Sequence, residues 1–125
     1  MPPFFTEREK TMALTAIYAH LSCSDLGRSV VWFTTVFERQ PDAQPMTGLA
    51  EWHHGKEAGF QLYENPDHAG KGTLTLIVDD ITGERERLLA GGIQANRIEA
   101  ADYTTIMRLR DPDGNLVVLA QPGRG

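Results

Sequence analysis

The sequence repeats a structural pattern at an interval of 55 residues, and this repeat constrains the fold more than any other feature. Asp25 and Asp80 each follow an apolar segment and are 55 residues apart, and so are Gly59 and Gly114. Matching intervals at two separate landmarks indicate a duplicated unit. Each half is predicted to contain a strand, a helix and three further strands. Because one helix covers one face of such a sheet, the two halves are expected to close their bare faces around a shared hollow.

The first half opens with an alternating segment at residues 14–23. Its odd-numbered positions from Ile17 onward are apolar and predict a core face, whereas its even-numbered positions from Tyr18 onward suit the wall of a cavity. Asp25 ends this strand and caps a helix predicted over residues 27–37. The pattern that follows predicts an edge strand or loop at 40–46, strands at 49–54 and 58–64, and a loop at 65–70.

The second half ends in the clearest turn signal of the chain, at residues 111–115. Pro112 fixes φ at the second turn position, and Gly114 can adopt the positive φ that such turns require. The apolar, β-branched run at 116–119 predicts a buried strand. The remaining pattern predicts a strand at 72–78, a helix at 82–90, a short strand at 94–100, and a closing hairpin of residues 103–110 and 115–120.

The composition is that of one globular domain. The chain has 125 residues, 41% of them hydrophobic and 23% charged, with a formal net charge of −5. This charge argues against a nucleic-acid-binding surface, which needs clustered Lys and Arg. No segment has the character of a membrane span or signal peptide, so a cytoplasmic location is expected. We expect an N-terminal arm at 1–12 and a single domain at 13–122, with modules at 13–66 and 71–122.

The chain has one cysteine, Cys23, which excludes an intrachain disulfide and a cysteine-based metal cluster. Cys23 lies within the first predicted strand, where a small buried apolar residue is the favoured interpretation. A catalytic thiol is the alternative, but no neighbouring residue clearly lowers the pKa of this side chain.

Four motifs follow one another along residues 14–121. They are residues 23–29, 78–81, 88–93 and 111–118. With these four motifs in this order, the chain resembles the vicinal oxygen chelate superfamily. This superfamily includes glyoxalase I, the bleomycin and fosfomycin resistance proteins and the extradiol ring-cleavage dioxygenases. The resemblance implies an α+β, glyoxalase-like fold: two βαβββ modules that form a cupped, mostly antiparallel eight-stranded sheet with the helices on the outside.

The resemblance also implies where the metal-dependent members hold a divalent ion. Their ligands are a His in the first strand and a Glu in the last strand of a module, and these positions correspond here to Tyr18, Gln61, Thr73 and Val118. Val118 has no donor atom, and none of the four carries a carboxylate, so this set does not suit a divalent ion. We therefore expect no metal and no other cofactor.

The same positions and their neighbours two residues away share one face of the predicted sheet. We expect this face to bind a small organic ligand, since it combines aromatic and apolar area with hydrogen-bonding groups. The alternative is an interior whose residues only fill space and bond one another. The predicted ligand-binding residues are Tyr18, His20, Gln61, Tyr63, Thr73, Thr75 and Val118, and Ala120 lies on the same face.

These observations predict a homodimeric protein of the glyoxalase/bleomycin-resistance type that binds a small organic molecule in the cup of the sheet without a metal. The alternative is an enzyme of the superfamily, a lyase, isomerase or ring-cleavage dioxygenase, in which His20 acts as acid or base. A metal site relocated to His20 with Glu51 or His53 belongs to this alternative. A third interpretation is an interaction module without a ligand. No nucleic-acid partner and no membrane partner are expected.

Overall fold

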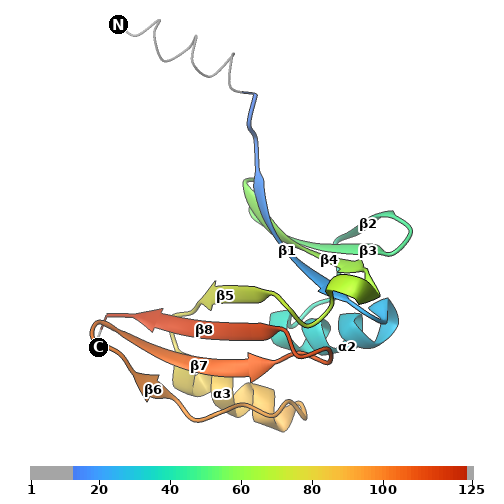
Figure 1. The fold of residues 1–125 in the computed structure, drawn as a ribbon. Helices are drawn as coiled ribbons and strands as arrows, with labels where there is room; N and C mark the ends of the chain where they lie inside the picture. Colours follow the sequence, from blue (N-terminus) through green and yellow to red (C-terminus); the bar gives the residue numbers. More distant parts are fainter. Residues whose placement is uncertain (1–12, 124–125) are drawn as a thin grey trace, which may run out of the picture.

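The computed structural model describes residues 13–123, which form two βαβββ modules (Figure 1). The predicted arm, residues 1–12, lies outside the described residues. Two strands coincide with their predicted ranges, β3 (Leu49–His54) and β4 (Ala58–Glu64). The other elements of the first module are β1 (Ile17–Cys23), α2 (Leu26–Phe37) and β2 (Ala43–Met46).

The second module repeats the order of the first after a short 3₁₀ helix, η1 (Pro66–His68). Its helix and its closing hairpin begin within one residue of the predicted positions, whereas the short strand predicted at 94–100 is confined to its last two residues. The elements are β5 (Thr73–Ile77), α3 (Ile81–Ala90), β6 (Glu99–Ala100), β7 (Thr104–Arg110) and β8 (Leu116–Pro122).

Each module forms a four-stranded sheet of its own. The first sheet has the order β1-β4-β3-β2, and the second has the order β5-β8-β7-β6. The pairs β1/β4 and β5/β8 are parallel, and the other neighbours are antiparallel. The two sheets meet through their edge strands β1 and β5 (Figure 1). This architecture confirms the predicted α+β fold of two βαβββ modules with mostly antiparallel strands.

The two aspartates that mark the sequence repeat begin the two helices. The Asp25 carboxylate accepts a hydrogen bond from Arg28 N at 3.1 Å, and the Asp80 carboxylate accepts one from Gly83 N at 3.1 Å. Each carboxylate satisfies a backbone N–H that has no partner within its helix. The interval of 55 residues in the sequence is therefore the interval between two helix N-caps.

Aromatic packing holds α2 against the first sheet. Measured between ring centroids, Phe33 lies 4.9 Å from Phe60, and Phe37 lies 5.3 Å from Trp52. These contacts compensate for the β-branched residues of the helix, which have low helix propensity. Tertiary packing, rather than local preference, maintains α2.

The apolar face of β1 is covered by α2 at one end only. Leu21 and Cys23 are buried, as predicted, but Ile17 is 70% exposed and Ala19 is also exposed. The expectation that the whole face lies in the core is therefore wrong for these two residues. The reason is that α2 begins directly after β1 and packs beneath its last residues, while the first half of the strand extends away from the helix (Figure 1).

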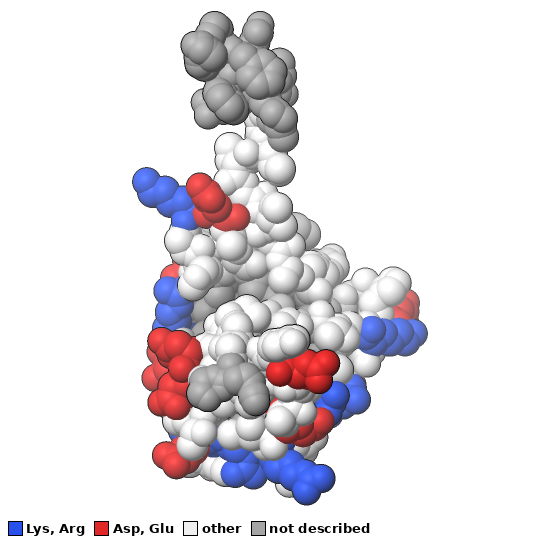
Figure 2. Space-filling model, turned by 90° about the vertical axis from the view of Figure 1, so that its left-hand side faces the viewer, with Lys and Arg blue, Asp and Glu red and all other residues white. Residues whose placement is uncertain are grey.

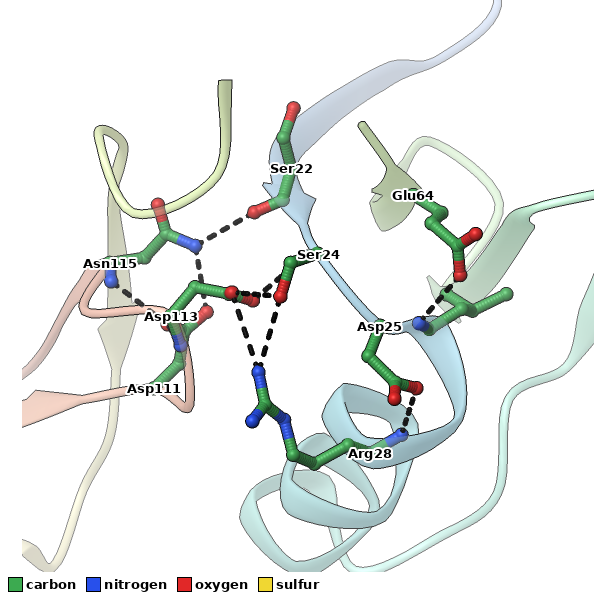
Figure 3. A network of polar contacts seen from close by, with 9 residues as sticks. Ser22, Ser24, Asp25, Arg28, Glu64, Asp111, Asp113 and Asn115 are labelled. Atoms are coloured by element: carbon green, nitrogen blue, oxygen red, sulfur yellow. Dashed lines mark hydrogen bonds and ion pairs between the residues drawn. The ribbon is translucent and has the colours of Figure 1, made fainter. Parts of the chain in front are cut away.

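The closing turn joins the two modules (Figure 3). Asn115 is fully buried, and its Nδ2 donates to the carbonyl of Ser22 at the end of β1, at 2.9 Å. Its Oδ1 accepts from the backbone N of Gly72, just before β5, at 2.8 Å. Asp113 accepts hydrogen bonds from the backbone N and the hydroxyl of Ser24. The turn that is clearest in the sequence thus holds the two sheets together.

The two helices are also linked to each other. Arg87 of α3 donates to the carbonyl oxygens of Thr35 and Val36 near the end of α2, at 2.6 and 2.9 Å. Carbonyls in the last turn of a helix lack partners within it, so the guanidinium supplies hydrogen bonds that α2 cannot form itself.

The molecular surface carries charges of both signs. On the face shown in Figure 2, Lys and Arg are interspersed with Asp and Glu around a largely uncharged centre. Among the described residues, no basic patch of the kind that binds phosphate backbones extends across this centre. Among residues 13–123, no helix has the length and apolar character needed to cross a membrane.

Replacing Asn115 with alanine is expected to destabilise the protein by about 2–4 kcal/mol, because two partly buried backbone groups, Gly72 N–H and Ser22 C=O, lose their partner. Urea unfolding measures the change. Asn96→Ala is the matched control, since Asn96 is exposed and its stability contribution is expected to be small. Equal stability of the two variants would contradict the role given to Asn115.

Candidate functional site

The alternation of the strands places a second set of side chains on the face of the first sheet opposite α2, which we call the outer face. Trp52 of β3 is buried against α2, so Glu51 and His53 point to the outer face. Phe60 and Leu62 of β4 are buried in the same way. The outer face therefore carries Tyr18, His20, Glu51, His53, Gln61 and Tyr63.

A row of hydrogen bonds crosses three strands of the outer face. The register places His20 opposite Gln61 and Gln61 opposite Glu51. His20 Nδ1 lies 3.2 Å from Gln61 Oε1, and Gln61 Nε2 donates to Glu51 Oε2 at 2.8 Å. The other oxygen of Glu51, Oε1, lies 3.0 Å from His53 Nε2. This polar row, His20–Gln61–Glu51–His53, connects two imidazoles through an amide and a carboxylate.

Two tyrosines flank the polar row. The ring of Tyr18 lies directly over Gly59, where a Cβ atom would come within 2.5 Å of Tyr18 Cε2. Tyr18 also meets His53 edge to face, with ring centroids 5.9 Å apart and an interplanar angle of 87°. On the other side, the rings of Tyr63 and His20 are 6.2 Å apart. The outer face thus combines aromatic area with hydrogen-bonding atoms, as ligand sites do.

The carboxylate at the centre of the row is held in its ionised form. Hydrogen bonds donated by Gln61, and then by His53, keep the pKa of the Glu51 carboxyl below its usual value. Its side chain is 13% exposed, whereas that of His53 is 40% exposed. The row therefore has a partly buried anion at its centre and more accessible imidazoles at its ends.

The predicted residues of the second module lie on the second sheet, on the face opposite the one that packs with α3. Thr73 and Thr75 are exposed on β5, and Val118 of β8 is paired with Thr75. Ala120 is buried. Arg108 of β7 is paired with Val118 and forms an ion pair with Glu99. This face therefore combines the hydroxyl and apolar groups of β5 and β8 with an ion pair between β7 and β6.

The structure brings together only part of the predicted ligand-binding set. Tyr18, His20, Gln61 and Tyr63 share the outer face of the first sheet. Within residues 13–123, no hydrogen bond or ring contact joins them to the predicted residues of the second sheet. The set is therefore divided between two sheets of one chain.

The residues at the implied metal positions do not fit a divalent ion. Tyr18 packs its ring over Gly59, and the amide of Gln61 is used within the polar row. Among the described residues, no group of three or more His, Cys, Asp or Glu side chains is arranged to hold a metal. For a site relocated to His20, Glu51 and His53, the two oxygens of Glu51 already bind Gln61 and His53.

Two members of the polar row, Glu51 and His53, are missing from the predicted ligand-binding set. The signal that identifies them is the alternation within residues 49–54, where the apolar Trp52 must face the core. Glu51 and His53 are the sequence neighbours of Trp52 and must therefore face away from the core. The ligand positions implied by the resemblance lie on the first and last strands of each module, whereas β3 lies between β4 and β2.

A groove of about 470 Å³ opens between the two modules. Its aromatic lining consists of Phe37 of α2 and of the sheet residues Trp52 and Phe60 that pack on it. Leu74 and Leu76 of β5 complete the apolar lining. The groove is thus centred on the helix side of the first sheet rather than on the outer face. The hollow predicted from the duplicated halves is not enclosed by the outer face of one chain.

Comparison with solved structures identifies the fold. A glyoxalase/bleomycin resistance protein from Catenulispora acidiphila superposes with a TM-score of 0.77 at 24% identity, covering 85% of this chain and 96% of that one. TnmS3, an antibiotic binding protein from Streptomyces sp. CB03234, gives 0.75 at 21% identity, covering 86% and 95%. Lactoylglutathione lyase from Agrobacterium tumefaciens gives 0.70 at 19% identity, covering 84% and 91%.

These similarities establish that the chain has the fold of the glyoxalase/bleomycin resistance proteins, as its motifs predict. Sequence comparison adds nothing further, since no family model and no curated protein matches the chain. At these identities the likeness concerns the fold, and the chemistry has to be argued from the residues of the site.

The lowered pKa of Glu51 depends on Gln61, so Gln61→Leu is expected to raise it toward the usual value. Because the folded-state pKa is depressed, the associated stability is present above about pH 4.3 and is lost as the pH falls through the lowered pKa. An NMR titration of the Glu51 carboxyl, with unfolding at pH 7 and pH 3, measures both effects. Gln94→Leu, at an exposed position, is the control. An unchanged Glu51 pKa in Gln61→Leu would refute this account.

Cys23 is expected to be inert in the folded protein. Burial raises the pKa of its thiol to about 11, so little thiolate exists at pH 8. A chromogenic disulfide reagent should react with Cys23 only after unfolding. Thr47→Cys, which adds a thiol at an exposed turn, should react with one equivalent of reagent at once. Rapid labelling of the native wild-type protein would support the catalytic-thiol alternative instead.

Proposed function

We propose that the protein binds a small organic molecule on the outer face of the first sheet, without a metal ion. The observation that carries this proposal is the polar row, whose hydrogen bonds orient two accessible imidazoles between two tyrosine rings. Both ends of the row are accessible to solvent, since His20 is exposed and the side chain of His53 is 40% exposed. A row that served only to stabilise the sheet would not require accessible imidazoles. Aromatic walls with a few oriented polar groups are typical of ligand sites.

A homodimer is part of this proposal. One chain leaves the outer face of the first sheet open. The other predicted ligand-binding residues, Thr73, Thr75 and Val118, lie on the second sheet. A second copy that places its second sheet over this face would enclose the ligand. The exposed apolar side chain of Ile77, which is 67% exposed and lies on the same face of β5 as Thr73 and Thr75, supports such an interface.

The proposed role is sequestration of the ligand. TnmS3, which shares the fold, is an antibiotic binding protein, and the donor set here lacks the carboxylates and histidines that the metal-dependent enzymes place at the corresponding positions. A protein of this kind needs affinity and no reacting group. Cytoplasmic location completes the proposal, because a sequestering protein acts where its ligand would otherwise act.

One observation favours an enzyme as the second candidate. His20 is hydrogen-bonded to Gln61 and exposed, so its imidazole is accessible to a ligand as an acid or base. Isomerisation, elimination or ring cleavage would then be the reaction class. Turnover of an identified ligand that disappears in His20→Ala would select this candidate over sequestration.

The proposal is tested by screening a library of planar aromatic compounds against the full chain and against two variants. Tyr18→Ala should lower the affinity for a bound compound roughly tenfold, because the contact with the tyrosine ring is lost. Tyr103→Ala should leave the affinity unchanged, since Tyr103 belongs to the second module and is 80% exposed. Equilibrium dialysis measures the affinities, and elemental analysis measures metal. Stoichiometric divalent metal in protein purified without chelator, or equal loss in both variants, would contradict the proposal.

A further inference from the structure

The direction of each hydrogen bond in the polar row can be worked out from its one fixed point, the ionised Glu51. An ionised carboxylate has no proton to donate, so both of its oxygens only accept. The group of Gln61 that faces Glu51 Oε2 must therefore be its NH₂ group. The orientation of the Gln61 amide does not have to be assumed, because a carboxylate that only accepts hydrogen bonds fixes which end of the amide faces it.

The amide then fixes the tautomer of His20. With the NH₂ group of Gln61 turned toward Glu51, its carbonyl oxygen faces His20 Nδ1 at 3.2 Å. A carbonyl oxygen only accepts, so Nδ1 must carry the proton. In the neutral imidazole the other nitrogen, Nε2, is then an acceptor. Among the described residues, Nε2 of His20 has no hydrogen-bond partner.

The same reasoning applies to His53 at the other end. Its Nε2 faces Glu51 Oε1 at 3.0 Å and must donate, which leaves Nδ1 as the acceptor of the neutral ring. The backbone of His53 is held separately, since its N–H donates to Asp42 and its carbonyl accepts from Arg39. Within residues 13–123, Nδ1 of His53 also has no hydrogen-bond partner. The row thus ends in two imidazole acceptors with an anion between them.

We infer that the outer face selects planar hydroxyaromatic ligands, which donate O–H groups to His20 Nε2 or His53 Nδ1 while their rings contact Tyr18 and Tyr63. Glu51 and Gln61 act as positioning residues that hold both imidazoles in the acceptor tautomer. The charge of Glu51 strengthens these acceptors and disfavours carboxylate or phosphate ligands. This inference rests on the proposed function, because it names the ligand class of the same face.

The tautomers are tested directly by nitrogen NMR of the full-length, isotope-labelled protein without ligand. In the neutral rings, His20 should be protonated at Nδ1 and His53 at Nε2. Gln61→Leu should remove the fixed Nδ1–H state of His20 and leave His53 unchanged, while Gln94→Leu should alter neither. Protonation of neutral His20 at Nε2 in the wild-type protein would overturn the inference.

Ligand selection is tested with two probes that differ by one methyl group, 2-naphthol and 2-methoxynaphthalene. The ring system is the same, but the ether has no O–H to donate, so the imidazole acceptor is left without a partner. Titration of the labelled protein should show 2-naphthol binding about tenfold more tightly, with shifts at Tyr18, His20 and Gln61. In Gln61→Leu this preference should fall, although the ring contacts remain.

The outcomes separate the two proposals. Equal affinities of the two probes at the outer face would overturn the inference and leave the proposed function standing. Shifts confined to the groove residues Phe37, Trp52 and Phe60, or no binding of either probe up to its solubility limit, would overturn both. Because the matched probes are compared on the wild-type chain, the test does not depend on the folding of any variant.

Discussion

Burial of Trp52 and Phe60 against α2 is the constraint on which the first sheet depends. These rings pack on Phe33 and Phe37, and they fix which face of β3 and β4 lies inside. Because side chains alternate along a strand, every neighbour of a buried ring must point the other way. The core thereby decides the position of the polar row, although no member of the row takes part in the core.

The register of the sheet then turns three separate residues into one connected row. His20 is 41 residues from Gln61 in the sequence, whereas Gln61 and Glu51 lie 10 residues apart on consecutive strands. The pairing of β1 with β4 and of β4 with β3 aligns all three. Alternation alone would place them on the same face without placing them in line. A shift of one residue in either pairing would bury part of the row and expose part of the core.

The sequence predicts the fold well because its signals are local. Asp25 and Asp80 cap helices by contacts within three residues, and alternation defines β3 and β4 to the residue. The errors arise where distant elements decide. The exposure of Ile17 depends on how far α2 reaches beneath β1, and the separation of the predicted site depends on how the two modules pack. Neither quantity has a local signature in the chain.

The site is predicted less completely for a related reason. Tyr18, His20, Gln61 and Tyr63 follow from alternation and from the resemblance, and the structure places them on one face. The bonding among them requires the strand order, which places β4 between β1 and β3 and so brings Glu51 within reach of Gln61. The direction of the hydrogen bonds, and hence the inferred ligand class, becomes accessible only once that contact is known.

The duplication has placed different chemistry on two equivalent sheet faces. Val118, on the strand that repeats β4, corresponds to Gln61 in the implied metal set and has no group that can bridge neighbouring strands by hydrogen bonds. Thr75, its partner on β5, therefore has no amide to orient it as Gln61 orients His20. In the proposed binding mode, the first sheet selects the ligand through hydrogen bonds, and the second sheet encloses the ligand and fits its shape. Because one chain keeps these two contributions on separate sheets, the proposal assigns selection to the single chain and enclosure to a second copy.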